Sequence, residues 1–468
     1  MFKAIFTNGF GILFSRILGF IRDMLTASIL GANVYSDIFF IAFKLPNLFR
    51  RIFAEGAFTQ VFLPAFTRSK IKSLFAVHIF VIFLSIIMIL SLLVTLFSQT
   101  ATRSLAIGFD DKTIAIAAPY VAINFYYLPL IFAVTFLSTL LQYKHRFAIT
   151  AFSTGLLNIT LIAALYFSKG DAQPVIVYYL SWGVIVGGVL QLLIHIAAIR
   201  QLGFCKMLLG GFKYFRLKSL HVKHETKKFR QQFLPAIWGN SGAQISSFLD
   251  TWLASFLVSG SISYLYYSNR VFQLPLALFA IATSIAIFPR ISRFIKNNEQ
   301  HKAHEYMRKG FWFLTSILTF STLFGFILSD EIVKMLFQRG AFTHEDAVAT
   351  SWALKMYMIG LIPFGLNKLF SLWLYASQMQ IKAAKITTYS LISDIIASIV
   401  LMQFYGAAGL ALGTTIAGTV SFVLTLKVFG KKEFLDILIS KKAIYLLLAS
   451  AVFIVILLII KELIHVYL

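Results

Sequence analysis

Residues 15–23 of the chain read SRILGFIRD, and residues 37–51 read DIFFIAFKLPNLFRR. Both stretches place cations and carboxylates inside apolar runs that are long enough to form transmembrane helices. A charged side chain within a bilayer is costly unless it faces water or a partner. The two stretches therefore predict membrane-spanning helices whose polar stripes face the interior of a helix bundle.

The composition of the whole chain agrees with a membrane protein. Of its 468 residues 59% are hydrophobic and only 13% are charged, against roughly 25% charged residues in an average soluble domain. The mean hydropathy is +0.82. A soluble fold could not bury this much apolar surface, and a helix is the element that satisfies its own backbone hydrogen bonds in lipid. We therefore expect an all-α polytopic membrane protein.

Apolar runs and their breakers predict the positions of the spans. Thirteen segments are expected to cross the membrane: 4–30, 34–66, 76–98, 113–141, 147–167, 173–199, 232–258, 262–289, 310–328, 347–376, 384–404, 406–429 and 442–461. The first contains Arg16, Arg22 and Asp23, which is untypical of a cleaved signal peptide. It is expected to remain as the first span.

The formal net charge of +24 has a topological cause. Cations gather in the loops after even-numbered spans, for example Arg68, Lys70 and Lys72, and again along residues 200–230. Loops after odd-numbered spans hold few cations and several acids, among them Asp110 and Asp111. The positive-inside rule then predicts a cytoplasmic N-terminus in an inner membrane. The basic excess is explained without a nucleic-acid partner.

The longest polar connection predicts how the chain is divided. Residues 201–231 are expected to form a basic cytoplasmic linker between a six-helix lobe at 1–200 and a second six-helix lobe at 232–429. Residues 430–468 are expected to add one helix and a lipid-tail groove. The single cysteine, Cys205, excludes an intramolecular disulfide.

The two halves resemble each other weakly. Residues 43–46 read FKLP and precede a second proline at Pro64, while residues 272–275 read FQLP and precede Pro289. Proline-interrupted helices in corresponding positions of two repeats are typical of a transporter whose site lies between the halves.

Cations outnumber carboxylates in the leading helices of the two halves. The cations are Arg16, Arg22, Lys44, Arg50, Arg51 and Arg270, and the acids are Asp23, Asp37 and Glu55. A guanidinium group offers a planar fork that suits phosphate oxygens. We therefore expect an anionic substrate, with pyrophosphate the best match. The alternative is that these groups pair with one another and hold helices together.

A second polar set lies in the later spans. Asp250 and Asp394 are mid-span, with Ser390 one turn before Asp394 and Thr414 on the next span. Carboxylate and hydroxyl oxygens can bind a small cation, and buried acids can carry a proton. Acids that are hydrogen-bonded to neighbouring hydroxyls are the alternative. No zinc, phosphate-loop or nucleophile motif is present, so an enzyme is not expected.

The two opening stretches, together with residues 53–58 (FAEGAF), closely resemble the MurJ (or MviN) family of lipid II flippases. Weaker similarity continues through residues 187–192 (GGVLQL), 254–261 (ASFLVSGS) and 266–270 (YYSNR). The resemblance implies the multidrug/oligosaccharidyl-lipid/polysaccharide exporter fold, with about 13–14 transmembrane helices in two pseudo-symmetric bundles around a central cationic cavity. It also implies alternating access that carries lipid II, an undecaprenyl-pyrophosphate-linked disaccharide peptide, from the cytoplasmic to the periplasmic leaflet.

The resemblance also assigns roles to residues. Arg16, Arg22, Arg50 and Arg270 match the family arginines that hold the pyrophosphate, and Asp37 and Glu55 match acids of the same lobe. Asp250, Asp394 and Thr414 match a family sodium site, where Ser390 replaces an expected asparagine. Na⁺ and H⁺ thus both stay open as the coupling ion. The tail groove is expected either from the helix at 442–461 alone or with an interfacial segment at 434–439.

Two other functions stay open at this point. One is an exporter of another polyprenyl-linked saccharide or of drugs, and the cationic spans argue against the cationic drugs that such exporters carry. The other is a scaffold for cell-wall synthesis proteins that transports nothing. Such proteins and membrane lipids are the further partners that we expect.

Overall fold

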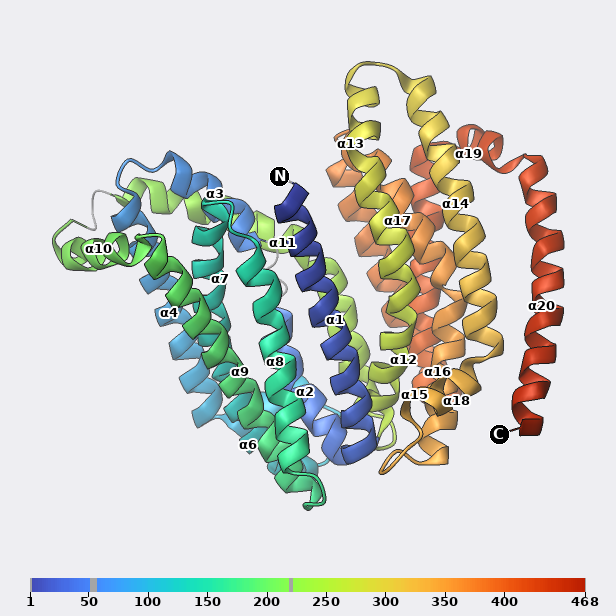
Figure 1. Ribbon diagram of the computed structural model, residues 1–468, viewed down its shortest axis with the longest axis horizontal. Coiled ribbons are helices and arrows are strands. Elements are labelled where there is room, and N and C mark those ends of the chain that lie inside the picture. Colours follow the sequence, from blue (N-terminus) through green and yellow to red (C-terminus); the bar gives the residue numbers. More distant parts are fainter. Residues whose placement is uncertain (1, 51–56, 219–221, 468) are drawn as a thin grey trace. The chain divides into compact units, whose positions relative to one another are not determined.

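The computed structural model describes residues 2–50, 57–218 and 222–467, and every regular element in these ranges is a helix (Figure 1). The chain divides into two compact units, Met1–Phe248 and Leu249–Leu468. The boundary falls inside helix α11 (Lys223–Ala254). The prediction of an all-helical protein is confirmed for the described residues.

The first unit contains the helices before this boundary. They are α1 (Phe2–Leu30), α2 (Val34–Phe49), α3 (Phe58–Arg68), α4 (Lys72–Leu96), α5 (Ser98–Leu105), α6 (Asp111–Phe125), α7 (Tyr127–Tyr143), α8 (Ala148–Phe167), α9 (Gln173–Gln201), α10 (Phe204–Lys218) and most of α11. Helix α8 packs against both α1 and α9, and α10 packs against α4. This unit carries Arg16, Arg22, Lys44 and Arg50.

A capping box fixes the start of α2. The Asn33 side chain accepts hydrogen bonds from the backbone N–H groups of Tyr35 and Ser36, and the Ser36 hydroxyl accepts one from the Asn33 N–H. These bonds satisfy N–H groups that a helix start leaves unpaired. The turn of chain between α1 and α2 is thereby fixed, and with it the direction in which α2 carries its charges.

A cluster of phenylalanines holds the first half of α11 inside the first unit. The side chains of Phe58, Phe62, Phe75 and Phe229 are fully buried, and the ring of Phe229 lies 6.1 Å from that of Phe58 and 6.4 Å from that of Phe62. Phe233, one turn later on α11, stacks on Phe229 at 5.4 Å. Edge-to-face and offset ring pairs add to the stability that the burial itself gives.

The second unit contains the remaining elements. They are α12 (Ser261–Pro275), the π-helix η3 (Leu276–Ile281), α13 (Ala282–Lys296), α14 (Gln300–Ile327), α15 (Ser329–Phe337), α16 (His344–Ile359), α17 (Leu361–Ala376), α18 (Gln380–Phe429), α19 (Lys431–Leu438) and α20 (Lys441–Tyr467). Helix α18 packs against α16 and α17, and α20 packs against α14. This unit carries Arg270, Asp250 and Asp394.

Helix α18 is two helical runs joined at Gly406. This residue has φ 54° and ψ −130°, a conformation that is open to glycine and strained for other residues. The kink coincides with the predicted break between spans 384–404 and 406–429. The 50-residue helix therefore corresponds to two of the predicted spans.

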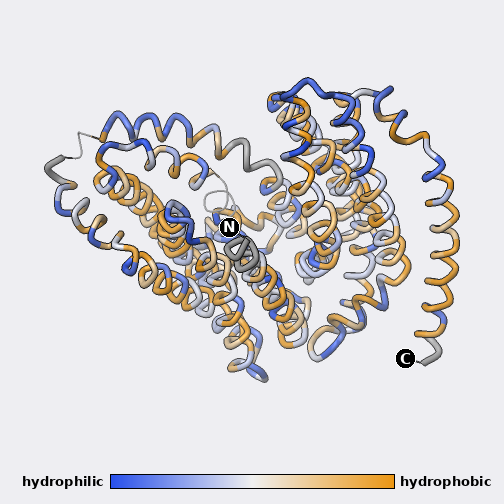
Figure 2. Tube along the Cα trace, turned by 45° about the horizontal axis from the view of Figure 1, so that its top comes forward, coloured by the Kyte–Doolittle hydropathy of each residue, from blue (hydrophilic) through white to orange (hydrophobic). Residues whose placement is uncertain are grey.

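Eight described helices or helix pairs are long and apolar enough to cross a membrane, and α16 with α17, bent by 40°, brings the number to nine. Among these nine, α18 is one, α6 with α7 is one and α12 with α13 is one, and α1, which contains Arg16, Arg22 and Asp23, is not included. Figure 2 shows hydrophobic residues along the long helices and hydrophilic residues gathered near their ends.

Three of the predicted segments have described helical structure. The span predicted at 34–66 contains α2 and α3, and residues 51–56 lie outside the described ranges. The linker predicted at 201–231 is largely helical, because α10 and the first turns of α11 bury phenylalanines against the first unit. The stretch at 434–439 lies largely on α19, which the indole N–H of Trp312 fixes to α14 by donating to the Ile437 carbonyl at 3.1 Å.

Candidate functional site

Arg22 is held by an acid and an amide in the interior of the first unit. Its exposed fraction is 7%, and that of Asp23 is 1%. The guanidinium donates to Asp23 Oδ1 from Nε at 3.1 Å and from Nη2 at 2.5 Å, and Nη1 donates to Asn158 Oδ1 at 3.0 Å. A buried charge needs such partners because burial otherwise strongly favours its neutral form. In this structure Arg22 is paired within the first unit.

Asn158 joins α8 to α1 at two points. Besides accepting from Arg22, it donates from Nδ2 to the Ser15 carbonyl oxygen at 3.0 Å. Gly19 lies between these two positions, and a Cβ atom there would be in ordinary van der Waals contact with Asn158, 3.5 Å from its Nδ2.

The other charges of α1 and α2 differ in their surroundings. Arg16 is exposed, although it lies two turns before Asp23, which is buried. Asp37 is 2% exposed and lies in the first turn of α2, where the helix dipole favours a negative charge. Lys44 is half-buried and donates to the Ser247 hydroxyl of α11 at 2.9 Å.

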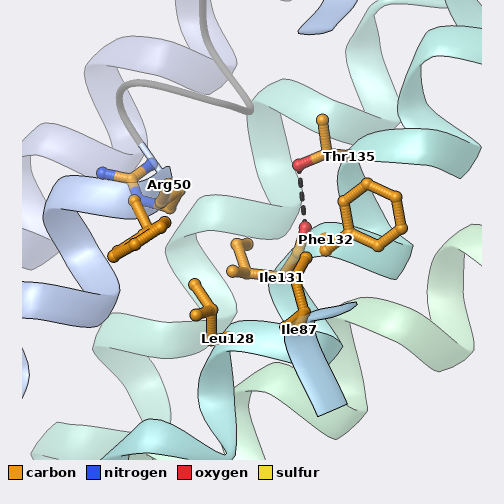
Figure 3. A pocket seen from close by; sticks show the side chains of 7 residues that line it. Arg50, Ile87, Leu128, Ile131, Phe132 and Thr135 are labelled. Carbon is orange, nitrogen blue, oxygen red and sulfur yellow. Dashed lines mark hydrogen bonds between the residues drawn. The ribbon is translucent and has the colours of Figure 1, made fainter. Parts of the chain in front are cut away.

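Arg50 follows the last residue of α2 and borders an apolar pocket (Figure 3). Its Nε donates to Asn47 Oδ1 at 3.1 Å. The pocket is lined by Phe49, Arg50, Ile87, Leu128, Ile131, Phe132 and Thr135. The Thr135 hydroxyl donates a hydrogen bond to the Ile131 carbonyl oxygen at 2.7 Å. Arg50 is the only charged residue among those that line the pocket. Arg51 and Glu55 lie outside the described residues.

Arg270 is half-buried on α12 in the second unit. Its Nη2 donates to the Tyr266 hydroxyl at 2.7 Å, and its Cζ lies 4.9 Å from the centre of the Tyr266 ring. Tyr266 thus fixes the plane of the guanidinium by a hydrogen bond and a cation–π contact from one turn away.

The second polar set is brought together in the second unit. The Thr414 hydroxyl of α18 donates to Asp250 Oδ2 at 3.1 Å. Asp394 is 2% exposed and accepts from the Ser398 hydroxyl at 3.4 Å. Both carboxylates interact electrostatically with the buried Tyr357, whose side chain also contacts Asn269 and Thr414. Oxygen ligands are therefore gathered near one tyrosine, which fits a small hard cation.

Ser390 is engaged elsewhere. Its hydroxyl donates to the Ala417 carbonyl oxygen at 2.8 Å, across the hairpin between the two runs of α18. The described residues contain no group of three His, Cys, Asp or Glu side chains that could hold a metal ion. A cation here would depend on the two carboxylates, the Thr414 hydroxyl and backbone carbonyls.

Three contacts of these sites from distant parts of the chain were missed in the sequence. Asn158, Ser247 and Tyr357 each contact a predicted site residue, and each comes from a distant part of the chain. A polar amide in the middle of the apolar run 148–167 was a signal for the first, because such groups usually join helices in a membrane. Ser247 and Tyr357 carried no comparable signal.

Comparison with known proteins places this geometry in a family. The model of the family described as lipid II flippase MurJ matches residues 26–468. A probable lipid II flippase MurJ of Helicobacter pylori is 50% identical over 452 residues, which are 94% of this chain and 98% of that protein. The corresponding protein of Vibrio cholerae is 32% identical over 432 residues, 88% of this chain and 79% of that protein.

Solved structures agree with the fold. A lipid II flippase MurJ in an inward closed conformation superposes with a TM-score of 0.80 at 25% identity, covering 98% of both chains. A multidrug transporter in an inward-facing conformation superposes with a TM-score of 0.57 at 12% identity, covering 93% of this chain and 94% of that one. The second likeness concerns the fold alone. The chain belongs to the family of lipid II flippases MurJ, whose members are multi-pass membrane transporters rather than enzymes.

Proposed function

We propose that this protein carries lipid II from the cytoplasmic to the periplasmic leaflet of the inner membrane by alternating access. One observation carries the proposal: the match to the flippase family extends over residues 26–468 and includes a relative that is 50% identical along nearly its whole length. The inward closed conformation of the solved relative agrees with a carrier that changes its access.

The headgroup would be held by the cations that are not enclosed by the first unit. Arg16 is exposed, and Arg50, Lys44 and Arg270 are half-buried, so their charges are accessible to a large anion. A pyrophosphate offers several oxygens to which arginine forks can donate in pairs. Arg51, Asp37 and Glu55 belong to the same proposed site. Arg22 and Asp23, which are buried with Asn158, would support it from behind by fixing α1 against α8.

Charge supports a cytoplasmic N-terminus. The cations in the loops after even-numbered spans favour a cytoplasmic location of those loops under the positive-inside rule. With this orientation the proposed substrate enters from the leaflet in which it is made.

Asp250, Asp394 and Thr414 would couple transport to an ion. The oxygens near Tyr357 suit Na⁺, and two carboxylates in the interior of a membrane protein also suit a transferable proton. Ser390 would contribute only if its hydroxyl left the Ala417 carbonyl. The membrane potential is an additional drive, worth about 2.3 kcal/mol for each charge moved through 100 mV.

The test is complementation of a bacterial strain depleted of its own lipid II flippase. The wild-type chain should restore growth and remove the lipid II that accumulates in the cytoplasmic leaflet. Arg270→Ala should fail at normal protein abundance, whereas Arg270→Lys, which keeps charge without the fork, should restore part of the activity. Arg146→Ala, which removes an exposed arginine of a loop, is the matched control and should behave as wild type.

Each contrary outcome has a meaning. Full growth with Arg270→Ala would remove this residue from the proposed site. A wild-type chain that restores growth while lipid II stays in the cytoplasmic leaflet would favour a scaffold of cell-wall synthesis over a flippase.

A further inference from the structure

Helix α10 packs against α4 and the end of α9 within the first unit, and at the margin of this contact the ring of Phe212 lies 6.4 Å from that of Phe80 on α4. Phe204 is 5% exposed, and Phe215 lies 5.6 Å from the ring of His78 on α4. A Cβ atom at Gly211 would overlap the Ser73 carbonyl oxygen and meet the side chain of Val77, so the backbones of α10 and α4 come close there. Figure 1 shows α10 running across the ends of α4 and α9 instead of beside them. The helix therefore lies where the spans α4 and α9 meet their loops.

The opposite face of α10 is both apolar and cationic. Lys206, Leu209 and Lys213 follow the spacing i, i+3, i+7 and share one face. Both lysines are exposed, and Leu209 and Phe212 are 68% and 46% exposed. Large apolar side chains beside lysines on a helix that lies across the ends of spans are typical of a helix in the membrane interface.

The sequence that contains α10 carries no acidic residue from 172 to 224. The next acid along the chain, Glu225, accepts a hydrogen bond from the Ser69 hydroxyl at 2.6 Å. Lys72 and Lys144 lie near the same end of the unit, both over the ring of Tyr143, whose centre is 6.4 Å from that of Phe204. A cationic surface with apolar side chains is complementary to phosphate groups lying above acyl chains.

We propose that the exposed face of α10, formed by Lys206, Leu209, Phe212 and Lys213, binds the anionic phospholipid surface of the leaflet at which α4 begins. Leu209 and Phe212 enter the boundary between headgroups and acyl chains, and the two lysines contact the lipid phosphates. Because α10 immediately precedes α11, this contact ties the helix that joins the two compact units to the membrane surface. It is independent of the substrate and of the residues that would bind it.

The experiment uses Cys205, the single cysteine of the chain, which lies next to Lys206 on α10 and is partly exposed. An environment-sensitive fluorophore is attached there, and the full-length protein is placed in nanodiscs of phosphatidylcholine with increasing phosphatidylglycerol. We expect a blue shift and stronger quenching by brominated acyl chains as phosphatidylglycerol rises, and reversal of both by salt. Lys206→Gln combined with Lys213→Gln should weaken this response about 25-fold, at about fivefold for each lysine.

The control variant combines Lys302→Gln with Lys309→Gln. These lysines are also exposed but form ion pairs with Glu299, the residue before α14, and with Glu305 on α14 of the second unit, and their loss should leave the response unchanged. Equal melting temperatures of the variants verify that the fold is intact. Any of three outcomes would overturn the proposal. The fluorescence could be independent of phosphatidylglycerol, the response could be undiminished in the α10 variant, or the shift could require an added acidic protein.

Discussion

Asn158 on α8 accepts a hydrogen bond from Nη1 of Arg22 on α1 at 3.0 Å. The two residues are 136 positions apart, and Asp23 neutralises the arginine from the other side. The family resemblance assigns Arg22 to the substrate, and the structure shows that Arg22 also takes part in the packing between α1 and α8. This amide therefore adds two hydrogen bonds to the apolar contacts between α1 and α8.

Replacing Asn158 by leucine should destabilise the protein, because the buried guanidinium would lose an acceptor and the Ser15 carbonyl a donor. The expected loss is about 1–3 kcal/mol. The measurement is the melting temperature in detergent. Asn297→Ala, which removes an exposed amide, should leave the melting temperature unchanged. An unchanged melting temperature in the Asn158 variant would show that α1 is held by apolar contacts alone.

Asp250→Asn and Asp394→Asn should each abolish the change in melting temperature that a bound cation produces. If Na⁺ binds there, sodium in place of potassium should raise the melting temperature of the wild-type protein. The free energy of unfolding should increase by about 2.7 kcal/mol when the sodium concentration is a hundred times the Kd. Asp171→Asn, an exposed loop residue, should keep the response. A pH response that both variants lose, without a sodium response, would assign the pair to a proton. Neither response in the wild-type protein would exclude both ions.

The ion pair of Asp330 with Lys355 should make stability fall in acid. Burial opposes ionisation of Asp330, but hydrogen bonds at 2.8 Å from Lys355 and at 2.5 Å from Ser351 outweigh it and leave its pKa below the ordinary value of 3.8. A lowered pKa means that the pair stabilises the protein above that value and that this stability is lost as the pH falls through the pKa of the folded state.

Asp330→Asn should therefore lower the free energy of unfolding at neutral pH by about 1 kcal/mol, and with it the melting temperature. The melting temperature of the variant should also depend less on pH in acid. Asp111→Asn is the control, because its ion pair with Arg103 is exposed. If the wild-type protein and the Asp330 variant lose stability in parallel as the pH falls, another group controls the acid response.

Adjacent glycines of α10 should respond differently to alanine. At Gly211 a Cβ atom would overlap the Ser73 carbonyl oxygen and approach Val77, so Gly211→Ala should push α10 away from α4. At Gly210 nothing lies within 4 Å, and alanine there should stabilise the helix by about 0.5–1 kcal/mol. Hydrogen exchange of the α10 amides should be faster in the first variant and slower in the second. Equal exchange in both would mean that α10 does not depend on this close contact.

The fold class and the positions of the helices could be predicted from the sequence because the membrane imposes a simple rule on every span. A segment in lipid must be apolar and helical over a fixed length, and the breaks at Gly406 and after Phe167 were visible as interruptions in composition. The resemblance at residues 15–58 was enough to predict the family. The candidate cations were visible for the same reason, since charges stand out in apolar runs.

What the sequence by itself determined was which residues are charged where charge is costly. Which of these charges are enclosed was decided only by the tertiary structure: Arg22 is locked between Asp23 and Asn158, while Arg16, on the same helix, is exposed. The same holds for Thr414, which reaches Asp250 across 164 positions, and for Ser390, whose hydroxyl is taken by a carbonyl. Hydrogen bonds join groups by distance in space, and periodicity along one helix contains no information about the partner on another.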